Sequence, residues 1–307
     1  MITCLGLAPA LDITYGLPSA RLGAIHRPDW QLSLPGGKSL NVARALALLG
    51  AEACAIVPVG GATGEELVAS LGFLGEDGRT RIDVIETGVP TRRCITIVDG
   101  GAGELTEIYE NAPPIPDDAW DEIVARVATV TEGWLAVSGS VPEHRISSLA
   151  AQLALATERG VQVALDVRQD VLDAVFAVCR PALVKVNRSE AADAVGTGST
   201  PELAHRLRVR GAGIAVVTDG ADGSVGEDDR GVWRVRAPRG GIFTVGAGDS
   251  FLAGLLHRLS AGAPLDTALR TASAVAGANT HEPGAAVFDP ARAALAESAV
   301  SVIPEGA

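Results

Sequence analysis

The sequence predicts an α/β fold in which helices cover both faces of a mostly parallel sheet. Short apolar runs recur along the chain, as expected for strands that are buried on both faces. These runs lie at 2–7, 53–59, 134–138, 161–166, 183–187 and 214–218. Longer amphipathic patterns separate them, and this alternation is typical of a three-layer α/β/α arrangement. We expect helices at 40–49, 64–74, 117–130, 145–159, 201–210, 249–260 and 265–280.

Two stretches, about 12–34 and 88–110, interrupt the alternation. They contain β-prone segments without intervening helices, such as RRCITIVD at 92–99 and ELTEIYE at 104–110. We expect a hairpin and a further pair of strands, which form a small antiparallel sheet outside the main core. Such a sheet beside a crevice would serve as a lid or as a dimer interface. The tail from about residue 300 is expected to fray.

The composition excludes several classes of protein. Hydrophobic residues make up 47% of the chain and charged residues 20%, which is enough apolar surface for a packed core. A net charge of −12 argues against nucleic acid or an anionic membrane as a partner. We find neither a signal-peptide pattern nor an apolar stretch of roughly 18 residues. Four scattered cysteines without a CxxC pair indicate small buried side chains in a reducing, cytoplasmic compartment.

The segment GIFTVGAGDSFLAGLLHRL, at 241–259, carries the strongest chemical signal. A β-prone run at 242–245 enters a Gly-Ala-Gly turn, and an amphipathic helix follows. Backbone amides of that turn would then form an anion site at a helix N-terminus. Asp249 beside this site is suited to accept a proton from an attacking hydroxyl. As a carboxylate at a helix N-terminus, we expect it to stay ionised and to act as a weak base. The alternative is that Asp249 only caps the helix.

A second glycine-rich turn precedes a helix in LPGGKSLNVARALALLG, at 34–50. Its glycines allow close backbone contact with a small ligand, and Asn41 can bond hydroxyl groups. Glycine-rich turns are also common in α/β proteins without such a role. Lys38 in this segment is one of only two lysines among the 25 basic residues, the other being Lys185. Lysines retained among arginines suggest a need for compact point charges, as at a phosphate.

Polar residues follow several of the predicted strands. In VKVNRSE, at 184–190, Asn187 and Glu190 would either hold a hydrated Mg²⁺ or form a capping box at a helix start. Ser138, Asp166 and Thr218 end other strands. In an open parallel sheet the ligand crevice lies beyond the carboxyl ends of the strands, so these groups should converge near Asp249.

With these segments in view, the chain resembles the PfkB/ribokinase family of carbohydrate kinases. PGGKSLNVARALALLG matches the family's N-terminal pattern, and TVGAGDSFLAGLL matches its C-terminal pattern. Within the family the chain is most similar to the 1-phosphofructokinase and tagatose-6-phosphate kinase branch. The matches to that branch are APALDITY, TRRCITI, SGSVP and KVNRSE.

The resemblance implies one ribokinase-like kinase domain over 1–307, with the lid inserted in it. It implies ATP-dependent phosphorylation of a sugar-phosphate hydroxyl, for example of fructose 1-phosphate, fructose 6-phosphate or tagatose 6-phosphate. ATP and Mg²⁺ would be the cofactors, and a monovalent cation stays open as another. The small-molecule substrate and a second copy of the chain, held through the lid, would be the partners.

The resemblance also implies roles for individual residues. Asp249 would be the catalytic base, with an anion hole made by Gly246, Ala247 and Gly248. Sugar hydroxyls would be bound by Asp12, Gly36, Gly37 and Asn41. The substrate phosphate would be approached by Lys38, Arg92, Ser138 and Arg27. ATP and Mg²⁺ would lie against Lys185, Asn187, Glu190, Thr218, Gly220, Gly223 and Asn279, with Glu190 reaching the metal through water.

Four positions depart from the branch pattern. Ala8 and Tyr109 stand where Asn is usual, Ser39 replaces Gly, and Val186 replaces Pro. Since three of these lie in substrate-side segments, a kinase for an unphosphorylated sugar or a nucleoside stays open. A catalytically silent sugar- or nucleotide-binding protein is a second alternative, against which the intact GAGD turn argues. An NAD-dependent oxidoreductase does not fit, because no GxGxxG follows the first strand.

Overall fold

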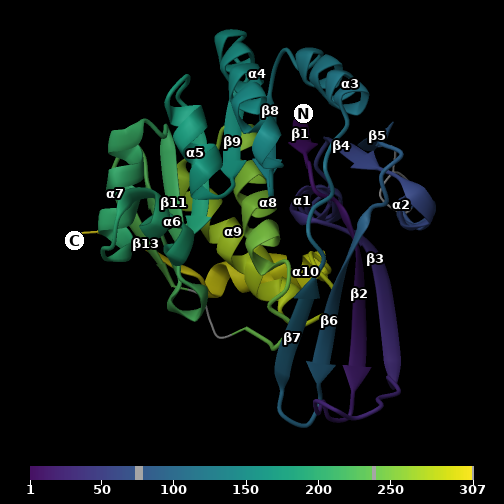
Figure 1. The fold of residues 1–307 in the computed structure, drawn as a ribbon. Coiled ribbons are helices and arrows are strands. Elements are labelled where there is room, and N and C mark those ends of the chain that lie inside the picture. The colour runs from purple at the N-terminus through teal and green to yellow at the C-terminus, as the bar shows by residue number, and fades with distance from the viewer. Residues whose placement is uncertain (73–78, 237–239, 306–307) are drawn as a thin grey trace.

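The computed structural model describes residues 1–72, 79–236 and 240–305, and this part of the chain folds around a ten-stranded sheet (Figure 1). From β11 to β5 neighbouring strands are parallel, whereas β12, β13 and β14 are antiparallel. The strands, in order across the sheet, are β14 (Ser301–Pro304), β13 (Val232–Arg236), β12 (Ser224–Glu227), β11 (Ile214–Thr218), β10 (Leu183–Asn187), β9 (Gln162–Asp166), β8 (Trp134–Ser138), β1 (Ile2–Leu5), β4 (Ala53–Val59) and β5 (Thr80–Glu86).

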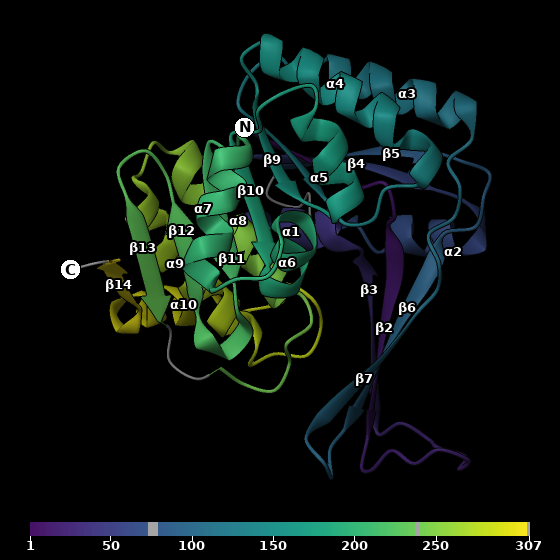
Figure 2. The same cartoon turned by 60° about the vertical axis from the view of Figure 1, so that its left-hand side comes forward.

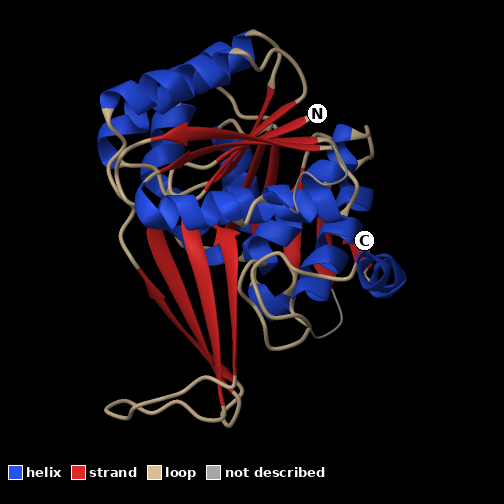
Figure 3. Ribbon diagram, turned by 90° about the vertical axis from the view of Figure 1, so that its right-hand side faces the viewer, coloured by secondary structure: helices blue, strands red, loops and turns tan. Residues whose placement is uncertain are grey.

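Helices cover both faces of this sheet, so the fold has three layers (Figure 3). The helices that pack on one face are α1 (Lys38–Leu48), α2 (Gly61–Ala69), α8 (Ala247–Ser260), α9 (Leu265–Asn279) and α10 (Pro290–Ala296). Those on the other face are α3 (Asp117–Ala128), α4 (Ile146–Glu158), α5 (Gln169–Phe176), α6 (Arg188–Val195) and α7 (Thr200–Arg210). The apolar strands are buried between the two layers, which confirms the predicted three-layer fold.

A second, four-stranded sheet projects from the body beside the carboxyl ends of the parallel strands (Figures 1 and 2). Its strands, in order, are β3 (Trp30–Gly36), β2 (Ala10–Leu17), β6 (Arg92–Asp99) and β7 (Glu104–Tyr109). Pairing is antiparallel within each of the two chain segments, as predicted, and parallel where β2 meets β6. We call this sheet the lid. In one row across it, Asp12 lies opposite Cys94, and Cys94 lies opposite Tyr109.

Local chemistry explains where three helices begin. At α6 the Asn187 side chain accepts from the Glu190 amide, and the Glu190 side chain accepts from the Asn187 amide. This is the capping box that the sequence left open. Ser199 and Glu202 form another at α7. At α8 the N-cap is Gly246, whose φ of 77° lies in the left-handed region that favours glycine.

The remaining differences between expectation and structure lie in short or irregular segments. The apolar strands are present, but α5, α10, β5, β12 and β13 were not predicted. The expectation of a frayed tail was wrong, since Ser301–Pro304 pair with β13 as the edge strand β14. The β-prone run at 242–245 forms no strand, and Phe243 instead donates its amide to Thr280 O. Helix α2 ends at Ala69, and residues 73–74 of the expected helix lie outside the described residues.

No helix among the described residues is long and apolar enough to cross a membrane. Cys4, Cys54 and Cys94 are buried, and Cys179 is half-buried. All four thiols are free. The prediction that the cysteines are small packed side chains is therefore confirmed.

Candidate active site

A cavity of about 950 Å³ lies between the carboxyl ends of the central strands and the inner face of the lid. Its walls include β9 and β10 at Asp166 and Lys185, the turn that opens α8, and lid residues such as Asp12. In a parallel sheet the carboxyl ends carry the ligand crevice, so the cavity lies where the strand-end residues predicted it. Its volume is enough for a small molecule and a nucleotide together.

The N-terminus of α8 forms one wall of this cavity, and the first glycine of its turn is sterically required. A Cβ atom at Gly246 would come within 2.5 Å of the backbone nitrogen of Ala286. At Gly248 a Cβ atom would lie 3.1 Å from Lys185 Nζ, so the ammonium group of that lysine sits directly beside the turn. Helix-end amides next to a lysine are suited to bind phosphate oxygens, although the Ala247 amide of this turn donates to Thr244 O at 3.2 Å.

Asp249 lies in the first turn of α8, lines the cavity and is 6% exposed. Its Oδ2 accepts a hydrogen bond of 2.8 Å from Asn41 Nδ2. Burial raises the pKa of Asp249 to about 6, although Lys38 and the Asn41 bond oppose the rise. Burial thus makes Asp249 more basic than the helix-end carboxylate expected from the sequence, although it is still ionised at neutral pH.

The structure also rules out the view of Asp249 as a simple cap. Helix α8 begins at Ala247, its N-cap is Gly246, and this helix start has no side-chain cap hydrogen bond. Since the Asp249 carboxylate faces Asn41 and the cavity, the side chain is placed for chemistry on a ligand.

The two lysines of the chain meet at one aspartate. Lys185 Nζ lies 2.7 Å from Asp166 Oδ2, and Lys38 Nζ lies 3.0 Å from Asp166 Oδ1. Asp166 is fully buried, yet the two ammonium groups hold its pKa down at about 2. In turn Asp166 raises the pKa of Lys38. Both lysines, which stand out by their scarcity in the sequence, thus belong to a single charged cluster in the cavity.

Glu190 stands at the edge of this cluster. Its Oε2 accepts from the Asn187 amide, and its Oε1 lies 3.7 Å from Lys38 Nζ. The described residues contain no group of three His, Cys, Asp or Glu that could hold a metal ion. A single carboxylate whose two oxygens are already bonded or paired suits a contact through water to a hydrated cation.

The lid supplies the opposite wall. Burial raises the pKa of Asp12 to about 7, and the charges of Arg44 and Arg92 oppose this rise. Arg92 donates to Ala8 O and to Glu110 O, each at 3.1 Å. Further out on the lid, Tyr109 donates its hydroxyl to Glu107, and both residues line the cavity. This end of the cavity thus combines two carboxyl groups with one guanidinium.

Most of the predicted site residues line the cavity. They are Asp12, Gly37, Lys38, Asn41, Arg92, Lys185, Asn187, Glu190, Thr218, Gly220, Gly223, Gly246, Ala247, Gly248 and Asp249. Residues far apart in the sequence therefore converge as expected.

Four predicted residues do not line it. Ser138 is buried and bonds to Ser39, while the following Gly139 and Ser140 reach the cavity instead. Gly36 stands behind Asp12, since a Cβ atom there would meet the Asp12 carboxylate. Arg27 is exposed in the loop between β2 and β3.

Asn279 is the fourth, and its position corrects the expected contact with the nucleotide. It is fully buried, and its Nδ2 donates to Phe243 O at 3.2 Å and to Val245 O at 2.9 Å. Its Oδ1 accepts from Ser250 Oγ at 3.0 Å. Asn279 therefore fixes the irregular segment that leads into the Gly246 turn.

Other lining residues were not identified from the sequence. Asp166 was noted only as a polar strand end, and Glu107, Cys94 and Arg168 were not singled out. One face of α9 contributes the small residues Ser273, Ala276, Gly277 and Thr280. Residues spaced three and four positions apart lie on one face of a helix. This run of small residues therefore indicates a groove beside α9.

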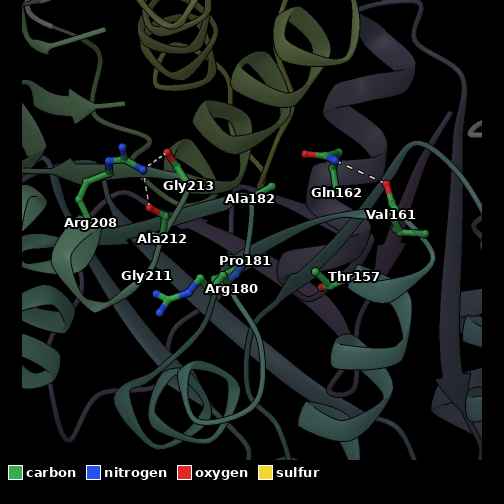
Figure 4. A pocket seen from close by; sticks show the side chains of 11 residues that line it. Thr157, Val161, Gln162, Arg180, Pro181, Ala182, Arg208, Gly211, Ala212 and Gly213 are labelled. Carbon is green, nitrogen blue, oxygen red and sulfur yellow. Dashed lines mark hydrogen bonds between the residues drawn. The ribbon is translucent and has the colours of Figure 1, made fainter. Parts of the chain in front are cut away.

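A second, smaller cavity lies at the opposite end of the strands (Figure 4). It measures about 460 Å³ and lies where β9, β10 and β11 begin. Arg180 and Arg208 border it, and Arg208 donates to Ala212 O. None of the described residues that line it is a carboxylate. It therefore offers no base comparable to Asp249.

A buried carboxylate beside a helix N-terminus and paired lysines is the arrangement of a phosphotransferase acting on a hydroxyl group. The profile of the pfkB family carbohydrate kinases matches residues 13–292. The chain is also 30% identical to the ATP-dependent 6-phosphofructokinase isozyme 2 of Escherichia coli, over 92% of this chain and 93% of that protein. The chain belongs to the pfkB family of carbohydrate kinases.

Solved structures agree with this assignment. The crystal structure of phosphofructokinase-2 from Escherichia coli in complex with substrates and products has a TM-score of 0.90 and 28% identity. Its complex with potassium gives 0.87 and 28%, and its tetrameric inhibited form gives 0.85 and 27%. Each comparison covers 97% of this chain and 98% of the other. The fold, the family and the enzyme class expected from the sequence are confirmed.

Proposed function

We propose that this kinase transfers the γ-phosphoryl group of ATP to a hydroxyl of a ketohexose phosphate. Fructose 1-phosphate, fructose 6-phosphate and tagatose 6-phosphate are the candidate acceptors. The observation that carries the proposal is the placement of Asp249, which is buried in the cavity wall at the start of α8. The named activity of the related Escherichia coli phosphofructokinase supports a phosphorylated sugar.

In the proposed reaction the sugar hydroxyl attacks the γ-phosphorus while the bond to the β,γ-bridging oxygen breaks. The hydroxyl proton passes to the Asp249 carboxylate, and ADP leaves with the bridging oxygen. With a pKa of about 6, Asp249 is ionised at neutral pH and more basic than an ordinary aspartate. The base is thus ready before the substrate arrives.

The negative charge of the migrating phosphoryl group would be held by the amides of Gly246, Ala247 and Gly248. Lys185 lies beside Gly248, and Lys38 joins it through Asp166. Since little covalent chemistry is required of the protein in phosphoryl transfer, fixed positive charge and positioning supply most of the rate.

The nucleotide would lie between β10, β11 and α9. Asn187, Thr218, Gly220 and Gly223 line this part of the cavity, and the small residues Ala276 and Gly277 leave room for a flat base. Magnesium bound with the nucleotide neutralises phosphate charge. Glu190 would hold one of the magnesium waters, because its carboxylate already faces the lysine cluster.

The acceptor would lie between Asp249 and the lid, with Asp12, Asn41 and the backbone of Gly37 bonded to its hydroxyls. Arg92 would face its phosphate group. One observation favours the second candidate, a kinase for an unphosphorylated sugar or nucleoside. The lid contributes the carboxyl groups of Asp12 and Glu107 to this wall but only Arg92 as a cation among the described lining residues. Carboxylates repel a phosphate and accept bonds from hydroxyls.

A substrate screen with coupled detection of ADP separates these candidates. We expect kcat/KM for at least one of the three ketohexose phosphates to exceed that for ribose, fructose and adenosine. The expected ratio is about a hundred-fold or more, the discrimination that a well-placed charge pair provides. Preference for an unphosphorylated acceptor would transfer the assignment to the second candidate. ATP hydrolysis without any acceptor preference, or no turnover at all, would contradict both.

We further infer a cytoplasmic, homodimeric enzyme formed by one kinase domain. The lid supports the dimer, because it exposes Ile108, and its loop between β2 and β3 exposes Leu22 and Ile25, of which Leu22 is fully exposed. Light scattering after gel filtration should give a dimer, and a double Leu22→Asp, Ile25→Asp variant should give a monomer. Assays with potassium and with tetramethylammonium chloride at equal ionic strength would show whether a monovalent cation is required.

A further inference from the structure

Arg44 lies beneath the active site, where it cannot reach a substrate. It is on α1, three residues after Asn41, its residue exposure is 2%, and it does not line the cavity. Its guanidinium nevertheless connects three parts of the site. Nη1 donates to Ala285 O at 2.7 Å and to Asn41 Oδ1 at 3.2 Å, and Nη2 donates to Pro35 O.

The bond to Asn41 determines how that amide is turned. An asparagine side chain presents an acceptor oxygen on one side and a donor nitrogen on the other. Since Arg44 can only donate, it holds the oxygen of Asn41 toward itself. The amide nitrogen then points to Asp249, to which it donates at 2.8 Å. A flipped amide would place its oxygen against the Asp249 carboxylate.

The charge of Arg44 acts on both carboxyl groups of the acceptor site. Burial lowers the pKa of Arg44 to about 10, and the charges of Asp12 and Asp249 oppose this, so the guanidinium stays charged at neutral pH. The charge of Arg44 is also the strongest influence that opposes the raised pKa of Asp12. A buried cation of this kind favours the ionised form of both acids.

We propose that Arg44 is a positioning residue for catalysis, which orients the Asn41 amide toward Asp249 and places a buried positive charge beneath the acceptor site. This inference rests on the proposed role of Asp249 as the base. It differs from a structural role, in which Arg44 would only tie the carbonyl groups of Pro35 and Ala285 together.

The test is the pH dependence of kcat for Arg44→Met, with saturating ATP and the best acceptor. Without the cation and the oriented amide, Asp249 and Asp12 bind protons more readily, so the acid limb should move to higher pH. At neutral pH kcat should fall by about ten-fold or more, as for loss of a hydrogen bond to a charged group. The charged groups that also act on Asp249 are Lys38, Asp166, Lys185, Asp12 and Arg44 itself, and all but Arg44 remain in this variant.

Arg44→Lys keeps the charge and loses the forked donor, so its acid limb should stay near that of the wild type while kcat falls. A double-mutant cycle with Asn41→Ala adds a second test. If Arg44 acts through Asn41, its substitution should lower kcat much less in an enzyme that already carries Asn41→Ala. Arg145→Met is the matched control, because this 11% exposed arginine also bonds a backbone carbonyl, Ile115 O, away from the cavity.

An unchanged acid limb with fully additive losses in the cycle would overturn the inference and leave Arg44 as a structural residue. Should Arg44→Met not fold, the Arg44→Lys profile and its cycle with Asn41→Ala decide the matter. Failure of the proposed function would look different, since the wild-type enzyme would then show no acceptor-dependent ADP release.

Discussion

The ammonium group of Lys185 lies 2.7 Å from Asp166 Oδ2, and the other oxygen of this carboxylate is bonded by Lys38. One buried acid thus holds every lysine of the chain. Lys185 is 5% exposed in its side chain and Asp166 is 1% exposed, so water screens this pair very little. Because this buried ion pair also lines the cavity, it contributes both to the stability of the fold and to the charge that a substrate meets.

For Asp166→Asn we expect the free energy of unfolding to fall by about 3–5 kcal/mol, because a buried lysine loses its counter-charge. Because the pKa of Asp166 is lowered in the folded state, its contribution is complete above about pH 4. It should fade as the pH drops toward 2. Urea denaturation at pH 7 measures the loss. ATP should restore part of the lost free energy of unfolding, since its phosphate oxygens can replace the carboxylate as partners of the lysines.

The control for this variant is Asp173→Asn. Asp173 forms an ion pair of 2.8 Å with Arg210, and its side chain is 47% exposed. Loss of such a pair should cost less than about 1 kcal/mol. Equal losses in the two variants would show that the Asp166 cluster is no more than an ordinary ion pair.

Asp249→Asn should lower kcat by about two to four orders of magnitude, the usual scale for a general base. Binding of ATP and of the acceptor should change little, because the amide has the same size. Stopped-flow measurement of the chemical step and calorimetric binding check both parts. Asp266→Asn serves as control, since Asp266 is also in the first turn of a helix, α9. A variant at Asp249 that turned over like the control would reduce this residue to a helix-end charge.

The pH profile of kcat in the wild-type enzyme should fall on the acid side with a midpoint near pH 6. The pKa of Asp249 is raised to about 6, so the carboxyl takes up a proton and stops accepting the hydroxyl proton as the pH drops through that value. Above it the base is ionised and the rate should level off. A midpoint near 4, the value of an exposed aspartate, would contradict the effect of burial.

Alanine at the two glycines of the turn should have different effects. In Gly246→Ala the new Cβ meets backbone atoms, and the φ of 77° is unfavourable, so we expect a loss of about 1–3 kcal/mol in stability together with activity. In Gly248→Ala the Cβ meets only the end of the Lys185 side chain. That variant should fold normally yet show a higher KM for ATP. Thermal melting and steady-state kinetics distinguish the two, and equal melting temperatures would contradict the steric argument.

The sequence predicted the regular part of this protein well. Buried parallel strands such as Ala53–Val59 and Leu183–Asn187 are continuous apolar runs, and glycine turns mark the helix starts that form the site. Asp249 and both lysines could be identified because each is tied to a local pattern or to an unusual composition.

Long-range contacts were not predictable in the same way. Nothing in the local sequence shows that Asn279 turns away from the cavity to hold Phe243 and Val245, or that Ser138 is covered by Ser39. The basicity of Asp249 was misjudged because its side chain is buried and bonded by Asn41 of α1, which the α8 segment does not reveal. Ser39 itself is accommodated because Gly6 lies opposite its side chain.

The parallel pairing of β2 with β6 has a consequence for how the chain matures on the ribosome. The two halves of the lid come from separate stretches, 10–36 and 92–109, and neither inner strand can complete its hydrogen bonding until the second stretch has emerged. Until then β2 is an open edge, which is a template for pairing with another nascent chain. The lid therefore cannot be completed before residue 109 has emerged, and during that interval its open edge is exposed to misassembly.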